Sequence, residues 1–495
     1  MKYVKQDKGG LMYEENLLWE KQRSDHPGVD LPAPQNLKLR TGQKERGDIG
    51  LPQVSEPQAL RHFVRMSTWN YSIDHGFFPL GSCTMKHNPR LNEKMARLAG
   101  FAHIHPKQPD ETVQGALRLM HELQNWLAEL TNLPGVCLSP AAGAHGELAG
   151  LMTIRRAHEL KGNTEKKVLL IPDSAHGTNP ATATMCGFTV RNIPTKNTGR
   201  VTLEAFKEAL GDGKDVAGMM VTNPNTCGLF ETEIVEIADL LHKHGGYFYC
   251  DGANFNALVG KIRPGDFGVD VMHINLHKTF STPHGGGGPG SGPICCTAEL
   301  AKYMPVPTVI KKGDQYKLET EKDRPETLGR LKGFNGQFGM FVRALAYMMS
   351  HGADGLKQVS EDAVLNANYI LAQLKNDFHA PFAEQGPCMH EALLTDKKQK
   401  EAGVTTLDMA KALCERGIHP MTVYFPLVVP GAMLIEPTET ESQDSIDYFI
   451  GVMKDFAKDV AAGDTQKFHD YPLSTPRRRL DEVKAAREPK LRWKA

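Results

Sequence analysis

The sequence lacks a hydrophobic run long enough to cross a membrane, and it lacks an excess of either charge. A membrane helix needs roughly 18 consecutive apolar residues, and no stretch of the 495 residues approaches that length. Lysine plus arginine and aspartate plus glutamate both total 58, which provides no basic field for nucleic acid and no acidic tail for a cationic partner. Since the polar residues 1–8 also lack the apolar core of a signal peptide, we expect a chain that binds neither nucleic acid nor a membrane.

Closely spaced pairs of cysteines of the metal-binding kind are missing as well. Nine cysteines are scattered along the chain without CxxC spacing, so the usual zinc and redox motifs are excluded and we predict no metal site. Cys295 and Cys296 are adjacent, which is more typical of a strand than of a metal site. An odd number of scattered cysteines in a long chain indicates reduced, mostly buried thiols and a cytoplasmic setting.

Short apolar runs that alternate with amphipathic segments predict the central fold. Runs at 168–171, 216–221, 247–250 and 271–276 have the length of buried strands. Residues 231–244 place their apolar side chains on one helical face. Strands that alternate with helices indicate a mostly parallel sheet covered on both faces. In such an α/β fold, ligands bind beyond the carboxyl ends of the strands.

The composition changes twice along the chain, which predicts three parts. Residues 1–60 are polar and contain several prolines, so they are expected to form an extended arm. Residues 61–334 are expected to form an N-terminal segment and a large α/β domain. In residues 335–495, long helices at 338–350 and 356–374 and short strand candidates predict a smaller C-terminal α+β domain that ends in a tail.

Lys278 and Asp251 are the residues most informative about chemistry. Asp251 closes one apolar run and Lys278 follows the next, 27 residues later (278 − 251). A pyridoxal phosphate (PLP) site needs a lysine that forms a Schiff base and an acidic residue that holds the pyridinium nitrogen. The aspartate keeps that nitrogen protonated, so the ring can accept electrons, while the lysine holds the aldehyde until an amino acid displaces it. The sequence therefore predicts a PLP site that Lys278 binds covalently.

Several small or flat side chains lie at positions where they can contact such a cofactor. Gly143, Ala144 and His145 precede a helix, and small residues at a helix N-terminus let backbone N–H groups approach a phosphate. His176 can stack its ring on the pyridine face. Ala253 is small enough to pack beneath the ring.

Three further candidates follow a predicted strand or immediately precede the lysine. Asn223 and Thr226 follow the run at 216–221 and can bond the phenolic oxygen of the cofactor, although a turn rich in Asn and Pro explains them equally well. His277 immediately precedes Lys278 and can shield or orient the Schiff base.

Two loops complete the predicted site. Ser82, Cys83 and Thr84 offer hydroxyls, a thiol and local N–H groups, which suit a substrate carboxylate. Residues 285–288 are four glycines, but the Gly-Lys-Ser/Thr ending of a phosphate-binding P-loop is missing. The glycine run is therefore predicted to be a loop that contacts the cofactor phosphate or a neighbouring subunit.

Five strings carry a more specific signal. Pro79–Lys86, Ser174–Ala181, Asp251–Asn254, Asn275–Phe280 and Pro283–Gly290 occur in this order. Together they resemble the glycine cleavage system P-protein, glycine dehydrogenase (decarboxylating). Single-chain members of that family contain two similar halves in tandem. The chain is similar to the lysine-bearing C-terminal half, which is subunit 2 where the family is split into two chains.

That resemblance implies a fold, a reaction and partners. The implied fold is the PLP-dependent transferase fold (fold type I), and Lys278 and His176 are the implied catalytic residues. The implied reaction decarboxylates glycine and transfers the aminomethyl group to the lipoyl arm of H-protein, within a system that also contains T-protein and L-protein. The implied assembly is a heterotetramer of two copies of this chain and two copies of subunit 1.

Three alternatives remain open. Another fold type I enzyme, such as an amino-acid decarboxylase or an aminotransferase, shares Lys278 and Asp251, although an aminotransferase normally needs an arginine for the substrate carboxylate. A non-catalytic PLP-binding regulator usually brings a nucleic-acid-binding module, and none is apparent. A nucleotide-binding role for residues 285–290 is disfavoured by the missing Lys-Ser/Thr. A requirement for H-protein would distinguish the glycine cleavage reaction from these alternatives.

Overall fold

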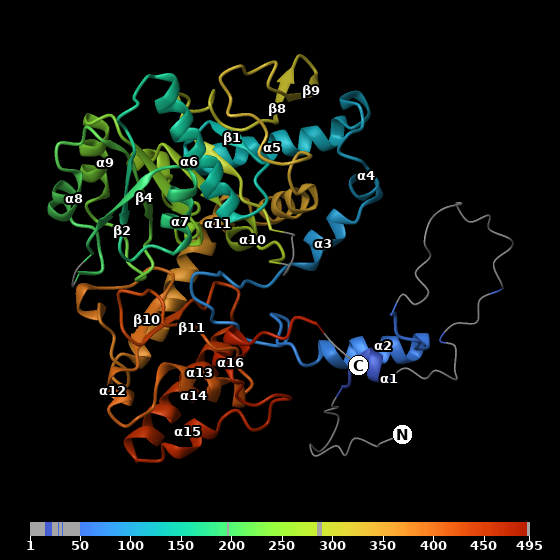
Figure 1. Ribbon diagram of the computed structural model, residues 1–495, viewed down its shortest axis with the longest axis vertical. Coiled ribbons are helices and arrows are strands. Elements are labelled where there is room, and N and C mark those ends of the chain that lie inside the picture. The colour runs from blue at the N-terminus through green and yellow to red at the C-terminus, as the bar shows by residue number, and fades with distance from the viewer. Residues whose placement is uncertain are drawn as a thin grey trace. The chain divides into compact units, whose positions relative to one another are not determined.

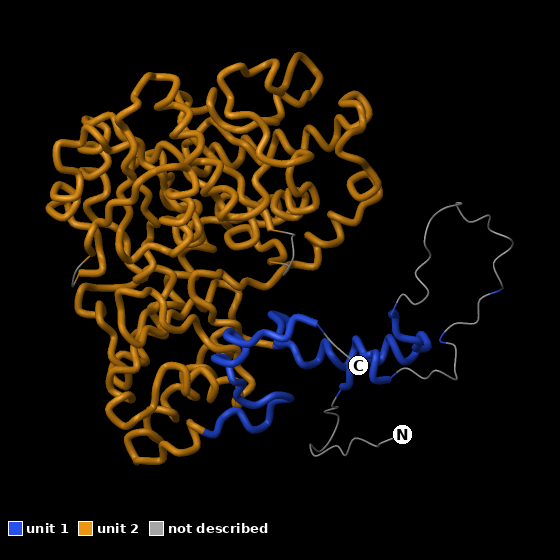
Figure 2. The backbone as a smooth tube through the Cα atoms, viewed as in Figure 1, with its two compact units in different colours: residues 1–75, 470–495 blue, residues 76–469 orange. Residues whose placement is uncertain are grey.

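The computed structural model describes residues 15–21, 28, 32, 50–195, 198–284 and 290–492. The chain divides into two compact units, one formed by Met1–His75 with Asp470–Ala495 and the other by Gly76–His469 (Figure 2). This division leaves the seven-stranded and the three-stranded sheet together in the larger unit, so the predicted domain boundary between residues 334 and 335 stays a prediction. Among the described residues, no helix combines the length and the hydropathy that crossing a membrane requires.

In the part of the smaller unit that the structure describes, there are three short helices. They are α1 (Leu18–Lys21), α2 (Glu56–Ser67) and α16 (Glu482–Arg487). Glu15 is buried, forms ion pairs with Lys21 and Arg65 and is hydrogen-bonded to His62 (2.9 Å), and these contacts join α1 to α2. Most of the arm predicted at 1–60 lies outside the described residues, namely 1–14, 22–27, 29–31 and 33–49.

A seven-stranded sheet forms the centre of the larger unit (Figure 1). Its strands are β1 (Gly135–Cys137), β2 (Val168–Pro172), β3 (Thr189–Ile193), β4 (Val216–Thr222), β5 (Tyr247–Gly252), β6 (Val271–Ile274) and β7 (Ile294–Cys296). The order across the sheet is β1-β7-β6-β5-β4-β2-β3. Strands β2 to β6 are parallel to their neighbours among themselves, whereas β7 runs antiparallel to β1 and β6. The four predicted apolar runs all form strands, and the mostly parallel sheet is confirmed.

Both faces of this sheet are covered, because alternate side chains of each strand enter different cores. On β5, Tyr249 packs with apolar side chains of α6 (Gly143–Leu160) and α7 (Thr178–Met185). Its neighbours Phe248 and Cys250 point to the opposite core. That core is completed by α5 (Gln114–Thr131), α8 (Leu203–Leu210), α9 (Ile234–Lys243) and the first half of α11 (Phe338–Leu374). The continuous apolar runs in the sequence reflect this two-sided burial.

A second, antiparallel sheet has the order β10-β12-β11, with β10 (Ala392–Thr395), β11 (Thr422–Val423) and β12 (Ala432–Ile435). Helix α11 leads into this region and has non-helical backbone at Gly352, so the two helices predicted at 338–350 and 356–374 meet at that glycine. The remaining helices here are α12 (Lys397–Lys400), α13 (Thr406–Glu415), α14 (Gln443–Ala461) and α15 (Gln466–Asp470).

Short elements connect these parts. They are α3 (Arg90–Ala96), α4 (Ala99–Ala102), α10 (Leu276–Thr279), the hairpin β8 (Thr308–Lys312) and β9 (Gln315–Glu319), and the 3-10 turns Asp110–Thr112, Phe255–Ala257, Pro264–Phe267 and Ala383–Gln385.

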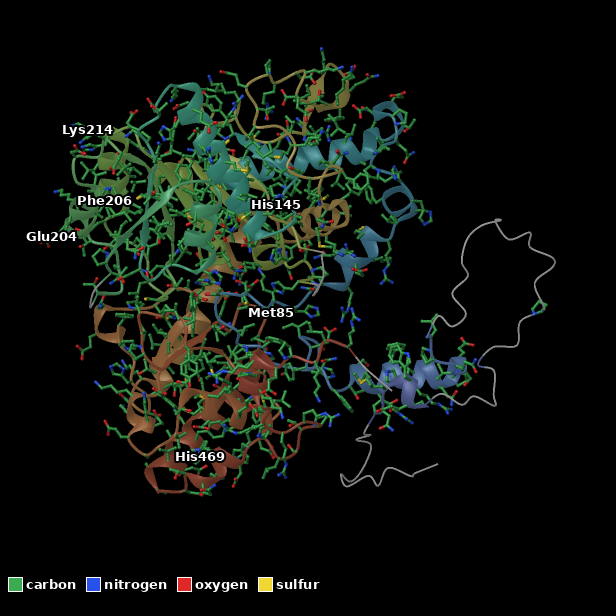
Figure 3. All side chains as sticks on the ribbon, viewed as in Figure 1. Met85, His145, Glu204, Phe206, Lys214 and His469 are labelled. Atoms are coloured by element: carbon green, nitrogen blue, oxygen red, sulfur yellow. The ribbon has the colours of Figure 1, made fainter. Side chains whose placement is uncertain are left out.

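The segment at 79–87 pairs with β12 of the second sheet through its backbone. Leu80 forms an antiparallel bridge with Ile435, and the N–H of Gly81 donates to the carbonyl of Leu434 (3.3 Å). Met85, labelled in Figure 3, marks this segment. The pairing fixes residues 82–84 beside β12, and it is these residues that reach Lys278.

Candidate active site

A cavity of about 290 Å³ lies at the carboxyl ends of β4, β5 and β6, where the α/β fold predicts a ligand site. Ten of the thirteen predicted site residues line it: Ser82, Cys83, Gly143, Ala144, His176, Thr226, Asp251, Ala253, His277 and Lys278. His145, Asn223 and Thr84 do not. A cavity of about 380 Å³ beside α5 and α11 has a mostly apolar lining and contains none of the predicted residues.

Lys278 lies on the single turn α10, directly after β6. Its backbone N–H donates to the carbonyl of Asn275 (3.0 Å), which closes the turn. Its half-buried Nζ donates to the carbonyl of Ser82 (2.6 Å), so the predicted lysine and the predicted substrate loop are in contact. The two residues are 196 positions apart in the sequence.

Asp251 ends β5 and is buried, yet it is surrounded by donors. Its Oδ1 accepts from the N–H of Ala253 (2.9 Å), and its Oδ2 accepts from the amide of Asn179 (2.9 Å). His273 Nε2 lies 3.3 Å from Oδ1. Burial raises the pKa of Asp251, but His273 and these donors outweigh it, so the pKa of the carboxyl lies below its usual value. A buried carboxylate that stays ionised is suited to a cationic ring nitrogen.

Glu147 on α6 is a second buried carboxylate near Asp251, and the sequence analysis missed it. It accepts hydrogen bonds from Thr178 (2.8 Å), Asn179 (3.2 Å) and Thr182 (3.3 Å) on α7. Because the amide of Asn179 donates to both carboxylates, Glu147 orients the group that holds Asp251. Its position at the start of a predicted helix carried no signal by itself; in the structure α6 begins one turn earlier, at Gly143.

His176 lines the cavity and is exposed, so its ring is accessible to a ligand. Its Nδ1 is hydrogen-bonded to the hydroxyl of Thr178 (2.8 Å), and its ring lies edge-to-face with Phe425 at 5.6 Å between centroids. These contacts fix the ring plane at the mouth of the cavity.

The start of α6 offers uncapped backbone. Helix α6 begins at Gly143, and Ala142 at its N-cap position provides no side-chain cap. A Cβ added at Gly143 would lie 2.7 Å from the amide nitrogen of Asn275, so glycine is required for this close approach. His145, labelled in Figure 3, accepts from the N–H of Ala141 (3.1 Å) and therefore supports the turn from outside the cavity.

Asn223 and Thr226 are largely used by the fold. Asn223 accepts from the N–H of Glu231 (3.1 Å) and does not line the cavity. Thr226 lines it but donates its hydroxyl to the carbonyl of Ser174 (2.6 Å). Both side chains thus hold neighbouring loops in place, as the turn interpretation predicted.

His277 and His284 form a neutral pair beside the lysine. Their ring centroids are 5.3 Å apart, and the N–H of Ser291 donates to Nδ1 of His277 (3.3 Å). Burial, together with the nearby Lys278, lowers the pKa of His277 to about 3 and that of His284 to about 4. The glycine loop predicted at 285–288 lies outside the described residues.

The loop at 82–84 has an unusual backbone. Ser82 and Thr84 have φ of 62° and 42°, which is left-handed backbone that residues other than glycine rarely adopt. Its N–H groups are already engaged, because Ser82 donates to Glu391 and Thr84 donates to Glu436 (3.0 Å). The side chain of Thr84 is buried away from the cavity, so Ser82 and Cys83 are the loop residues that face a ligand.

Glu391 and Glu436 were also missed by the sequence analysis, together with the adjacent His390. All three are fully buried, and potential ligand atoms of the three lie within 4.8 Å of one another. Glu391 immediately precedes β10, and Glu436 immediately follows β12. A carboxylate directly beside an apolar run was the available signal, and it is the same signal that identified Asp251.

Comparisons with known proteins agree with this geometry. Residues 30–317 match the family model described as glycine cleavage system P-protein, and residues 359–474 match the one described as glycine dehydrogenase, C-terminal domain. A protein of Caulobacter vibrioides named "Probable glycine dehydrogenase (decarboxylating) subunit 2" is 58% identical over 491 residues, covering 98% of this chain and 93% of the relative.

The chain belongs to the glycine cleavage system P-protein family.

A relative of the same name from Caldanaerobacter subterraneus is 52% identical over 446 residues and 90% of each chain, so the family resemblance predicted from the sequence is confirmed. Among solved structures, glycine decarboxylase (P-protein) in inhibitor-bound form has a TM-score of 0.68 at 20% identity, over 87% of this chain and 92% of that chain. A sphingosine-1-phosphate lyase of Burkholderia pseudomallei has a TM-score of 0.60 at 16% identity, over 86% and 94%. These structures confirm the predicted fold type I architecture for the P-protein chain.

Proposed function

We propose that this P-protein chain binds PLP covalently through Lys278, decarboxylates glycine and passes the aminomethyl group to the lipoyl arm of H-protein. The observation that carries the proposal is the placement of Lys278 and the ionised Asp251 in one cavity at the strand ends. The relatives' printed name, glycine dehydrogenase (decarboxylating), supports the substrate and the bond that breaks.

The residues of the cavity fit the cofactor. Asp251 supplies a buried negative charge for the pyridinium nitrogen, and the uncapped start of α6 at Gly143 supplies N–H donors for a phosphate. His176 presents an exposed ring at the mouth. When bound, PLP supplies an electron sink for the charge that remains when carbon dioxide leaves.

The chain's own residues would orient the substrate and the lysine. Ser82 and Cys83 face the cavity and are proposed to contact the glycine carboxylate. The carbonyl of Ser82 holds Nζ of Lys278. The neutral His277 and His284 add no positive charge that would compete with Lys278.

The cavity lining also bears on the alternatives. Among the described residues that line the cavity there is no arginine, whereas an aminotransferase normally uses one for the substrate carboxylate. A volume of about 290 Å³ must hold both the cofactor and the substrate, which favours a small amino acid.

The proposed assembly is a heterotetramer of two copies of this chain and two of subunit 1, working with H-protein, T-protein and L-protein in the cytoplasm. The words "subunit 2" in the relatives' names support a partner chain. Helix α2 exposes Leu60, Phe63 and Val64, which are 53–63% accessible and suit burial in an obligate interface. All nine cysteines are free, as expected in a reducing compartment.

The test is carbon dioxide release from carboxyl-labelled glycine by the chain co-expressed with subunit 1. We expect release that requires lipoylated H-protein, and loss of release in Lys278→Ala but not in the exposed control Lys302→Ala. Borohydride reduction followed by peptide mass spectrometry should find the pyridoxyl group on Lys278. Amino-group transfer to a keto acid without H-protein would support the aminotransferase alternative instead.

A further inference from the structure

Two buried glutamates face each other behind the loop that contacts Lys278. Glu391 directly precedes β10 and Glu436 directly follows β12. These two strands are antiparallel, so both glutamates lie at the same edge of the second sheet, and neither is exposed. Potential ligand oxygens of the two carboxyl groups lie within 4.8 Å of each other. Two carboxylates this close and this deeply buried repel each other, so the arrangement favours a proton on one of the two.

The surroundings favour one proton and one negative charge. Burial, followed by repulsion from Glu436, raises the pKa of Glu391 well above its usual value, and burial raises that of Glu436 to about 7. The positive charge of Lys278 favours a negative charge on the pair, whereas the nearby Glu439 disfavours a second negative charge. His390 adds no charge, because burial lowers its pKa to about 3, and its Nε2 is 3.8 Å from Glu436.

The pair is linked to Lys278 through a single residue. Ser82 donates its N–H to Glu391 and accepts from Nζ of Lys278 with its carbonyl (2.6 Å). Thr84, two residues later, donates its N–H to Glu436 (3.0 Å). Left-handed backbone at both residues is unfavourable, so it persists only where the surroundings hold it. The glutamates supply that restraint.

We propose that Glu391 and Glu436 are positioning residues that share one proton, hold residues 82–84 in the left-handed conformation and thereby orient Lys278. This deepens the proposed function and rests on it, since the loop that they hold is the one proposed to contact substrate. The same carboxylates with His390 have the spacing of a cation site, but the positive charge of Lys278 already stabilises a charge on them and a shared proton relieves their repulsion.

The test uses the cofactor-free full chain and the thiol of Cys83, which lies between the two anchored residues. Cys83 and Cys414 are half-buried, whereas the other seven cysteines are buried. Burial raises the pKa of Cys83, Lys278 lowers it, and both glutamates raise it. The rate of Cys83 alkylation by iodoacetamide against pH, followed by peptide mass spectrometry, therefore reports both the charge of the pair and the hold on the loop. Cys414 in the same sample is the control.

Glu391→Gln should leave the pH midpoint of Cys83 alkylation unchanged. The neutral amide replaces the protonated carboxyl, accepts from Ser82 and donates to Glu436, so the single negative charge stays. Adding Glu436→Gln removes that charge and should lower the midpoint by on the order of one pH unit. Glu391→Leu removes the anchor of Ser82 and should speed the alkylation about fivefold or more at fixed pH. Cys414 should not respond in any variant.

Two results would overturn the inference. A shift in Glu391→Gln as large as that caused by the second substitution would mean that both carboxyls are ionised. An unchanged rate in a folded Glu391→Leu chain would mean that the glutamate does not hold the loop. If that variant does not fold, the comparison of the two Gln variants still decides the shared proton. Absence of a pyridoxyl group on Lys278 would refute the proposed function without altering these thiol rates.

Discussion

Substituting Lys86 by methionine should destabilise the larger unit and loosen the segment that carries Lys278. The side chain of Lys86 is fully buried, and its Nζ forms an ion pair with Glu439 at 2.6 Å. It also donates to Asn256 (2.9 Å) and to the carbonyl of Thr279 (2.8 Å), the residue after Lys278. Burial lowers the pKa of Lys86, but Glu439 and Tyr347 outweigh it, so the pKa lies above its usual value. A methionine of similar length keeps the volume and removes the charge.

The magnitude follows from what remains buried. The side chain of Glu439 is 9% exposed, so removal of Lys86 leaves an uncompensated carboxylate. Breaking a buried pair from one side costs about 3–5 kcal/mol. For a unit of this size we expect a fall of roughly 4–6 °C in the unfolding midpoint. The raised pKa of Lys86 means that its contribution is fully present below its unfolded value of 10.5 and is lost only as pH rises through the folded value. The difference between variant and wild type should therefore be constant from about pH 6 to 9.

The assay is thermal unfolding followed by circular dichroism, with Lys261→Met as the matched control. The ion pair of Lys261 with Glu361 is 41% and 46% exposed, so the control should cost no more than about 1 kcal/mol. Adding Glu439→Gln to Lys86→Met should recover part of the loss, because the unpaired charge disappears. Equal midpoints for Lys86→Met and the control would refute the buried-pair argument, as would a failure of Glu439→Gln to recover any stability.

Four further outcomes follow from the site. Lys278→Ala should show no pyridoxyl adduct and no glycine decarboxylation, and an adduct on another lysine would contradict the assignment. Asp251→Asn should keep PLP bound but slow turnover about 100-fold or more, because a loss of several kcal/mol in charge stabilisation is tenfold per ~1.4 kcal/mol; near-normal kcat would count against its role. His176→Ala should weaken PLP binding in a fluorescence titration, whereas unchanged affinity would leave the histidine a structural role. The chain purified without subunit 1 should release little carbon dioxide, and full activity alone would exclude the two-subunit proposal.

The central strands could be predicted because their burial leaves a mark in the sequence. Strands β4 and β5 are buried along their whole length, so they appear as continuous apolar runs. Strand β3 is an edge strand with exposed and half-buried residues, and its Thr-Val-Arg-Asn-Ile sequence has no such run. Cys295 and Cys296 do form part of a strand, as their adjacency predicted.

The sequence predicted which residues follow the strands and so lie near the site, but it did not predict where their side chains point. Residues that follow parallel strands converge at one edge, which brought Asp251, His176 and Lys278 together correctly. The direction of each side chain depends on its partners, and the sequence does not contain that information. Asn223 and Thr226 follow a strand in the same way, yet their polar atoms bond to Glu231 and Ser174 and support loops.

The second group of glutamates was beyond prediction for a different physical reason. Glu391 is 309 residues from the Ser82 that it holds, and Glu436 is 352 residues from Thr84. Only the pairing of the loop at Leu80 with β12 brings them together. Each of the two lies directly beside an apolar run, but a carboxylate at the end of a strand is usually solvated, so that position alone did not show that these two are buried.

Asp251 and the pair Glu391 and Glu436 differ in protonation state because their surroundings differ. Asp251 accepts from two N–H donors and lies beside His273, which holds its pKa low. Glu391 and Glu436 face each other, and burial raises the pKa of both. Carboxyl groups whose pKa values are shifted in opposite directions take different roles: one stays ionised, and the other keeps a proton. The charge of Lys278 favours the ionised form of all three carboxyl groups, so the lysine interacts with a carboxylate that stays ionised and with a pair that keeps a proton. That asymmetry leaves Asp251 as the carboxylate suited to a cationic ring, while the pair balances the lysine and holds its loop.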